Sequence, residues 1–204
     1  MPRGEEKKNR ISVIDVILIL LIVVLTATTL IKTYWLSPVL VDGGSMTDTI
    51  QNGDWLIMDK KKTPAYGDII VIKIDQNTNY IKRAIAFEGD SIRTIDGELY
   101  RKKKGETEYV RLSEPYVGDK KTYGAENTDI PETTVAKGEI YFLGDNRTGS
   151  TDSRKIGTRP LTDVIGVIPD WSLKYRHNYV WYYKFLSSVN GLRHEKTHGE
   201  TVNG

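Results

Sequence analysis

The sequence predicts a mainly β protein: an N-terminal transmembrane helix, then an antiparallel β domain with an inserted smaller β subdomain. Three observations carry this prediction. An apolar run fills residues 11–31, and short segments rich in β-branched and aromatic residues follow it. No long stretch of helical periodicity occurs after the run. Short strands without helices between them favour antiparallel pairing.

The apolar run Ile11–Ile31 contains a single charged residue, Asp15. A helix of this length, rising ~1.5 Å per residue, crosses a hydrocarbon core of ~30 Å. Tyr34 and Trp35 follow, where an interfacial aromatic belt is expected. A cleaved signal peptide has the same basic start and apolar middle, but this run exceeds the usual apolar region and lacks a small-x-small end. We therefore expect an uncleaved, single-pass anchor.

Basic residues precede the anchor, at Arg3, Lys7, Lys8 and Arg10. Positive charge stays on the cytoplasmic side of a membrane. The sequence thus predicts that residues 1–10 are cytoplasmic, that the anchor lies in the cell membrane, and that the rest of the chain is extracellular.

Four segments after the anchor are predicted to be strands because they are short and rich in β-branched or aromatic residues. They are "DWLIMDK" (54–60), "GDIIVIKI" (67–74), "NYIKRAIAF" (79–87) and "GEIYFLGD" (138–145). In "DSIRTIDGELYRK" (90–102), Asp-Gly between two strand-like arms predicts a hairpin. "DVIGVIPDWSLKYR" (163–176) is predicted to form one or two late strands.

Changes in polarity suggest the domain limits. The main β domain is expected over 36–102 and 137–189, with the more polar segment 103–136 as the inserted subdomain. Residues 190–204 read as a disordered polar tail. The aromatic run 179–185 is either a terminal strand in the core or a surface resting on the bilayer, and we favour the strand.

Composition excludes several kinds of site. The 29 Lys+Arg nearly balance the 27 Asp+Glu, giving a net charge of +2, which gives little support to nucleic-acid binding. The absence of cysteine excludes disulfides, thiolate zinc sites and a cysteine nucleophile. Two of the three histidines lie in the polar tail. We expect no metal and no organic cofactor.

A serine in "VDGGSM", Ser45, is the first candidate for chemistry. A serine hydroxyl needs a base, and a catalytic triad is disfavoured because His177, the one histidine near the β region, has no acidic neighbour in sequence. A desolvated lysine can serve instead. Strand alternation in "YIKRAIAF" places Tyr80, Lys82 and Ala84 on one face, with Arg83 pointing away. The alternative for Lys82 is a surface side chain whose stem lies along apolar neighbours.

The third candidate is the polar stretch "GDNRTGSTDSR" (144–154) after an apolar strand. It is either a surface loop closed by Asp–Arg pairs or a loop that supports another site. For support it offers hydroxyls, an amide and carboxylate–guanidinium pairs.

Together these pieces resemble bacterial type I signal peptidases of the single-span Gram-positive type. The resemblance runs from the anchor to about Ile168 and includes, in order, "GGSM", "GDWLIM", "GDIIVI", "YIKRAIAFEGD" and "GDNRTGSTDSRKIG". It implies a membrane-anchored serine endopeptidase with a Ser/Lys dyad that removes signal peptides from exported preproteins. The implied partners are those preproteins and the lipid bilayer.

The resemblance also implies roles for residues of this chain. Ser45 would be the nucleophile and Lys82 the general base, with Ser150 orienting the lysine amine and Tyr80, Phe142 and Leu143 desolvating it. The remaining implied roles are loop geometry for Asp145, Asn146, Arg147, Asp152 and Arg154, backbone oxyanion stabilisation at Gly43 and Gly44, and substrate pockets at Ile81 and Met46.

Two positions depart from the family pattern. Gly43 replaces a serine that contributes to the oxyanion hole in some members, and Asp48 stands where proline is expected. An aspartate near Lys82 would favour the ammonium form, so Asp48 predicts lowered activity if it lies there.

Two alternatives stand beside this interpretation. One, which Asp48 favours, is a catalytically impaired relative that acts as a membrane-anchored assembly factor. The other is a repressor-type Ser-Lys protease, which would need a DNA-binding domain where the anchor lies.

Overall fold

The computed structural model describes residues 12–124, 127–176 and 196–198, and the chain divides into two units, residues 1–36 and 37–204. The predicted cytoplasmic segment 1–10 and the aromatic run 179–185 lie outside the described residues.

The first unit is the helix α1 (Val13–Tyr34). It begins with a capping box: the Ser12 side chain accepts the N–H of Ile14, and the Asp15 carboxylate accepts the N–H of Ser12 at 2.9 Å. Asp15, the only charge in the predicted span, thus stabilises the start of the helix. Among the described residues, one helical stretch, Val13–Ile31, is long and apolar enough to cross a membrane, with a mean hydropathy of 2.8.

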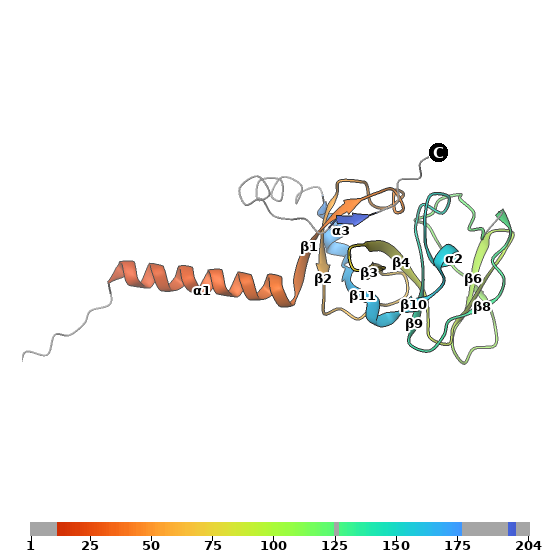
Figure 1. Ribbon diagram of the computed structural model, residues 1–204, viewed down its shortest axis with the longest axis horizontal. Helices are drawn as coiled ribbons and strands as arrows, with labels where there is room; N and C mark the ends of the chain where they lie inside the picture. Colours follow the sequence, from red (N-terminus) through yellow and green to blue (C-terminus); the bar gives the residue numbers. More distant parts are fainter. Residues whose placement is uncertain (1–11, 125–126, 177–195, 199–204) are drawn as a thin grey trace, which may run out of the picture. The chain divides into compact units, whose positions relative to one another are not determined.

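An eight-stranded sheet forms most of the second unit, in the order β10-β9-β4-β3-β11-β2-β1-β12 (Figure 1). β3 pairs antiparallel with both β4 and β11, and β4 pairs antiparallel with β9, whereas β12 runs parallel to β1. The strands are β1 (Leu36–Asp42), β2 (Trp55–Asp59), β3 (Ile69–Lys73), β4 (Asn79–Phe87), β9 (Glu139–Leu143), β10 (Arg159–Pro160), β11 (Val164–Ile168) and β12 (Lys196–His198). The prediction of a mainly antiparallel β fold is confirmed.

A second sheet of four strands has the order β7-β6-β5-β8, and β6 and β8 stand apart from β2, β3 and β11 in Figure 1. Its strands are β5 (Ser91–Ile95), β6 (Glu98–Lys102), β7 (Val110–Arg111) and β8 (Thr133–Thr134). The predicted hairpin is confirmed: Asp96 and Gly97 link β5 to β6 with φ of 51° and 71°, the positive values that a type I′ turn requires. This sheet draws β5 and β6 from before residue 103, the expected start of the insertion.

The large sheet curls around a shared core. Val39 of β1, Leu56 of β2, Val71 of β3 and Ile81 of β4 belong to one buried cluster, although β3, β11 and β2 separate β4 from β1 in the hydrogen-bonded order. The curl brings the end of β1 close to β4. A second buried cluster, which includes Ile85, Ile92 and Leu143, packs the two sheets together.

Two predicted elements differ from the structure. After β11 the chain forms a short helix, α3 (Asp170–Lys174), so a second late strand is wrong there. The helix packs on β2, since buried Ser172 accepts the N–H of Ile57 at 2.6 Å. Disorder is wrong for Lys196–His198, which form β12; the rest of the predicted tail lies outside the described residues. The remaining short elements are α2 (Ser153–Ile156) and the 3₁₀ turn η2 (Leu161–Asp163).

Candidate active site

Ser45 and Lys82 meet where the end of β1 approaches β4. Ser45 lies in the turn after β1, and Lys82 lies within β4. The Lys82 Nζ is 2.6 Å from the Ser45 Oγ and 4.8 Å from the centre of the Tyr80 ring. Only 2% of Lys82 is exposed. The predicted alternation, which places Tyr80 and Lys82 on one face, is confirmed, and the alternative of a surface lysine is wrong.

Local backbone geometry shapes the turn that carries Ser45. Gly43 has a φ of 123°, which side chains disfavour, and its N–H donates to Asn52 Oδ1 at 3.0 Å. The N–H of Thr47 donates to the carbonyl of Gly44 at 3.2 Å. Among the described residues, no hydrogen bond occupies the backbone N–H groups of Gly44 and Ser45.

The loop after β9 fastens this turn from the other side. The Asn146 N–H donates to the carbonyl of Ser45, and its Nδ2 donates to the carbonyl of Gly44, both at 3.0 Å. The Asp145 N–H points to the sulfur of Met46 at 3.3 Å. A Cβ on Gly144 would lie 2.6 Å from the carbonyl oxygen of Ser45. Close approach of two backbones therefore requires glycine at position 144.

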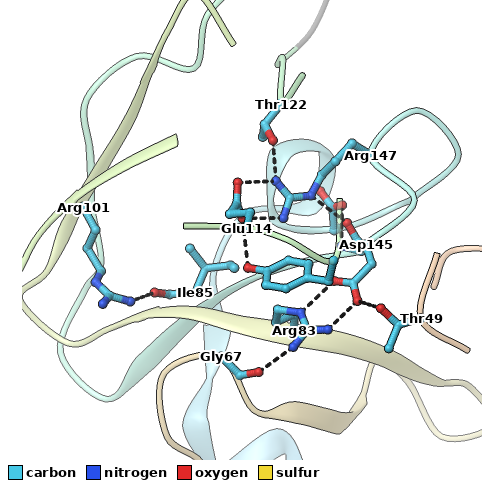
Figure 2. Close-up of polar contacts among 12 residues, drawn as sticks. Thr49, Gly67, Arg83, Ile85, Arg101, Glu114, Thr122, Asp145 and Arg147 are labelled. Carbon is cyan, nitrogen blue, oxygen red and sulfur yellow. Dashed lines mark hydrogen bonds and ion pairs between the residues drawn. The ribbon is translucent and has the colours of Figure 1, made fainter. Parts of the chain in front are cut away.

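Asp145 is fully buried and pairs with Arg83 (Figure 2). The Arg83 Nε donates to Oδ1 at 2.8 Å and its Nη2 to Oδ2 at 2.5 Å, while the Thr49 hydroxyl donates to Oδ2 at 2.5 Å. The guanidinium also donates to the carbonyl of Gly67 at 2.7 Å. One carboxylate thus joins β4, the loop after β9 and the segment that follows Ser45.

Arg147 connects the same loop to the segment 103–136 (Figure 2). Its Nε donates to the carbonyl of Gly144 at 2.9 Å, its Nη2 donates to Glu114 at 2.6 Å, and its Nη1 donates to the Thr122 hydroxyl. The Tyr116 hydroxyl donates to the same Glu114 carboxylate at 3.0 Å. The loop is therefore also held by the connection between β7 and β8.

Asp152 and Arg154 close the end of the loop. Asp152 caps α2, and its carboxylate accepts the N–H of Gly144 at 3.0 Å and both Nε and Nη2 of Arg154 at 2.8 Å. Burial raises the pKa of the Asp152 carboxyl, but the hydrogen bonds from Arg154 and Gly144 outweigh it, so the pKa lies below its ordinary value of 3.8.

Three other predicted site residues, Ser150, Met46 and Ile81, are buried, and none of them makes a contact that shows its predicted role. Ser150 is buried, but its Oγ has no hydrogen-bond partner among the described residues, so the expected bond to the Lys82 amine is not formed in this structure. Its side chain packs instead against Gly144. Met46 and Ile81, expected to line substrate pockets, belong to the buried cluster under the large sheet. Their roles stay predictions.

Asp48 forms a salt bridge with Lys120, whereas its predicted effect on activity required it to lie near Lys82. Both of its carboxylate oxygens lie 2.7 Å from the Nζ of Lys120. The expected interaction of Asp48 with Lys82 is therefore replaced by a salt bridge to the segment 103–136.

Sequence reasoning missed several supporting residues. Arg83 had a signal, a second charge inside the apolar strand "YIKRAIAF", but was expected only to point away from Lys82. Thr49, Glu114 and Lys120 had none, because their partners are distant in sequence. No group of three or more metal-ligating side chains gathers within the described part of the chain.

Comparison with known proteins places this arrangement in a family. Residues 11–170 match the model of the family described as signal peptidase, peptidase S26. Signal peptidase I U from Bacillus subtilis (strain 168) is 34% identical over 79% of this chain and 87% of its own. Signal peptidase I from Bacillus licheniformis is 33% identical over 74% and 82%, respectively. A signal peptidase I structure from Enterococcus faecalis V583 shares 30% identity, with a TM-score of 0.44, covering 53% of this chain and 98% of that one.

These matches define the class of the protein as a serine endopeptidase. The chain belongs to the signal peptidase family, peptidase S26, as a type I signal peptidase that removes signal peptides from preproteins. None of the comparisons supports the alternative of a non-enzymatic assembly factor.

Proposed function

We propose that Ser45 and Lys82 form the catalytic dyad of this signal peptidase. The observation that carries the proposal is the 2.6 Å approach of the Lys82 Nζ to the Ser45 Oγ, made by a lysine that is only 2% exposed. A lysine can activate a serine hydroxyl only as a neutral amine, so its environment must disfavour the ammonium form.

Two features of the Lys82 environment act in opposite directions. Full burial lowers the pKa of a lysine by up to about 3–5 units, equivalent to about 4–7 kcal/mol. The nearby Tyr80 ring attracts a cation by about 2 kcal/mol in a desolvated site. Burial is the larger effect, so we expect the pKa of Lys82 to lie well below the ordinary lysine value of about 10.4 and a larger share of its amine to be neutral at pH 7 than in an exposed lysine.

The reaction follows from this arrangement. Neutral Lys82 takes the proton of Ser45 as Oγ attacks the scissile carbonyl, and the N–H groups of Gly44 and Ser45 stabilise the oxyanion. The Lys82 ammonium then protonates the leaving amine as the C–N bond breaks, which leaves an acyl-enzyme on Ser45. Lys82 next deprotonates a water, whose oxygen attacks the ester; as the ester bond breaks, the Lys82 ammonium returns the proton to Ser45 Oγ, which releases the signal peptide and regenerates the serine hydroxyl and the neutral amine.

The surrounding network would keep the two groups in place. Asn146 and Gly144 contact the Ser45 turn, while the Arg83–Asp145 pair ties that turn to β4. Asp152 and Arg154 hold the loop end, and Ser150 stays the proposed orienting hydroxyl for Lys82. Small side chains of the substrate at positions −1 and −3 would bind shallow pockets near Met46 and Ile81.

We further propose that α1 anchors the enzyme in the cell membrane as a single span. The basic residues before α1 support a cytoplasmic N-terminus and an extracellular second unit. An anchored enzyme meets membrane-tethered preproteins at a raised effective concentration. We propose no nucleic-acid partner, because the 29 Lys+Arg nearly balance the 27 Asp+Glu.

The test is cleavage of a purified preprotein by the intact chain in detergent, beside the variants Ser45→Ala and Lys82→Ala. We expect cleavage after a small-x-small site, and its loss in both variants while their circular dichroism stays unchanged. Cleavage by a folded Lys82→Ala variant at the normal rate would disprove the dyad.

A further inference from the structure

The last described strand of the chain lies beside both strands of the candidate site. β12 pairs parallel with β1 in the register Leu40↔Lys196, Val41↔Thr197 and Asp42↔His198. β12 also contacts β4, the strand that carries Lys82. A C-terminal segment of the chain therefore occupies the edge that leads into the Ser45 turn.

The hydrogen bonds of the β1 backbone show which of its N–H groups point toward β12. The Val41 N–H donates to the carbonyl of Asp54 at 2.9 Å, and the Val41 carbonyl accepts the N–H of Gly53 at 2.8 Å, so both polar groups of Val41 face β2. Backbone groups alternate in direction along a strand. The N–H groups of Leu40 and Asp42 consequently face the side on which β12 lies.

When no strand of the protein covers it, a strand edge such as that of β1 binds extended peptides through main-chain hydrogen bonds. A substrate on the β1 edge would be held extended as it passes Ser45. Because β12 is parallel to β1, its C-terminal end points the way β1 runs, toward the nucleophile turn. Substrate and β12 would use the same backbone groups.

We propose that Lys196–His198 is an intramolecular competitor that occupies the peptide-binding edge of β1. This inference rests on the proposed function, in that the competing ligand is the extended cleavage region of a preprotein. Tethering gives the segment an effective concentration in the millimolar range. A strand of three paired residues is short, so a preprotein with a longer extended segment displaces it.

The first test is amide hydrogen exchange on the full chain carrying Lys196→Pro and Thr197→Pro. Only alternate N–H groups of a strand face its neighbour. Because prolines stand at two successive positions, one of them removes an N–H group of β12 that faces β1, whichever of the two positions that is. The control is Lys196→Ala with Thr197→Ala, which shortens the same side chains but keeps both N–H groups.

We expect the amides of Leu40 and Asp42 to exchange faster in the proline variant than in the alanine variant. The amide of Val41, bonded to Asp54, should stay equally protected in both. Equal exchange at Leu40 and Asp42 would overturn the proposal, whether or not the chain cleaves a preprotein.

The second test is the kinetics of preprotein cleavage by the same two variants. Competition predicts a KM about two- to tenfold lower in the proline variant, with kcat unchanged. Faster exchange at β1 without any change in KM would show that the segment docks but does not compete, which also overturns the proposal. If neither variant cleaves, the proposed function fails, and the exchange result alone decides whether the segment docks.

Discussion

Adjacent residues of β4 carry two buried cations, and the structure treats them differently. Arg83 donates two hydrogen bonds to the buried Asp145 carboxylate and forms an ion pair with it. Lys82 instead contacts the hydroxyl of Ser45 and the ring of Tyr80. A buried charge is costly unless it is paired, whereas an amine can lose its proton and become neutral. The buried ion pair gives Arg83 a structural role, and the contact with Ser45 is the basis of the chemical role that we propose for Lys82.

Asp48 is predicted to have little effect on the dyad, because Lys120 pairs with its carboxylate. In Asp48→Asn we expect kcat/KM within about twofold of the parent, since a half-exposed ion pair contributes about 0–1 kcal/mol. The acidic limb of the pH profile should not move. If Asp48 instead acted on Lys82, its removal would lower the pKa of the lysine and shift that limb to lower pH.

Asp152 should make stability depend on pH at acid values. Its folded-state pKa lies below 3.8, so the carboxylate stabilises the fold above that pH and loses this contribution as pH falls through the folded pKa. Urea unfolding of the parent and Asp152→Asn should therefore differ most at neutral pH and converge as the pH falls through the folded-state pKa, which lies below 3.8. A constant difference down to that pH would show that Asp152 stabilises the fold without ionising.

At the scale of elements, the loop between β9 and α2 decides the geometry of the site. It contacts the turn that carries Ser45 through Gly144 and Asn146, and it contacts the segment 103–136 through Arg147. We therefore expect the proposed dyad to depend on a third element besides β1 and β4.

Gly144→Ala tests this dependence. The new Cβ would collide with the Ser150 side chain and lie 2.6 Å from the Ser45 carbonyl oxygen, displacing the loop, the turn that carries Ser45, or both, so we expect kcat to fall by at least about tenfold with a smaller change in KM. Gly124→Ala is the matched control, because its Cβ meets nothing closer than 3.6 Å. Equal kcat in the two variants, both folded, would contradict a role for the loop in positioning Ser45.

Local patterns predicted the elements well where they carry their own signal. The dipeptide Asp96–Gly97 predicted the hairpin, because these residues adopt the positive φ that its turn requires. Alternation in β4 predicted that Lys82 lies on the same face as Tyr80. The helix α3 was missed because a five-residue helix has too few turns to show a period.

The partners of Arg147 and Asp48 could not be predicted, because Glu114 and Lys120 lie in a polar segment without periodicity. Pairing of β12 with β1 was missed for a similar reason, since three polar residues show no strand pattern.

At the scale of the whole molecule, the chain combines an apolar helix with a β unit that holds the complete candidate site. Ser45 and Lys82, together with Tyr80 and Asn146 that contact them, lie within residues 37–204. The helix is therefore expected to localise the enzyme rather than to take part in the chemistry.

Topology can be tested with a short epitope at each end of the chain in intact cells. Protease added outside should remove the second unit, and the N-terminal epitope should stay protected by the membrane. Protection of the second unit with loss of the N-terminal epitope would reverse the proposed orientation.

The most direct test of the central claim is the ionisation of Lys82 itself. The intact chain would be labelled with ¹³C at lysine Cε and titrated by NMR, with Lys82→Arg used to assign the Lys82 signal. We predict that Lys82 titrates well below the ordinary lysine pKa of about 10.4. A Lys82 signal that titrates at or above that value would contradict its role as the general base for Ser45.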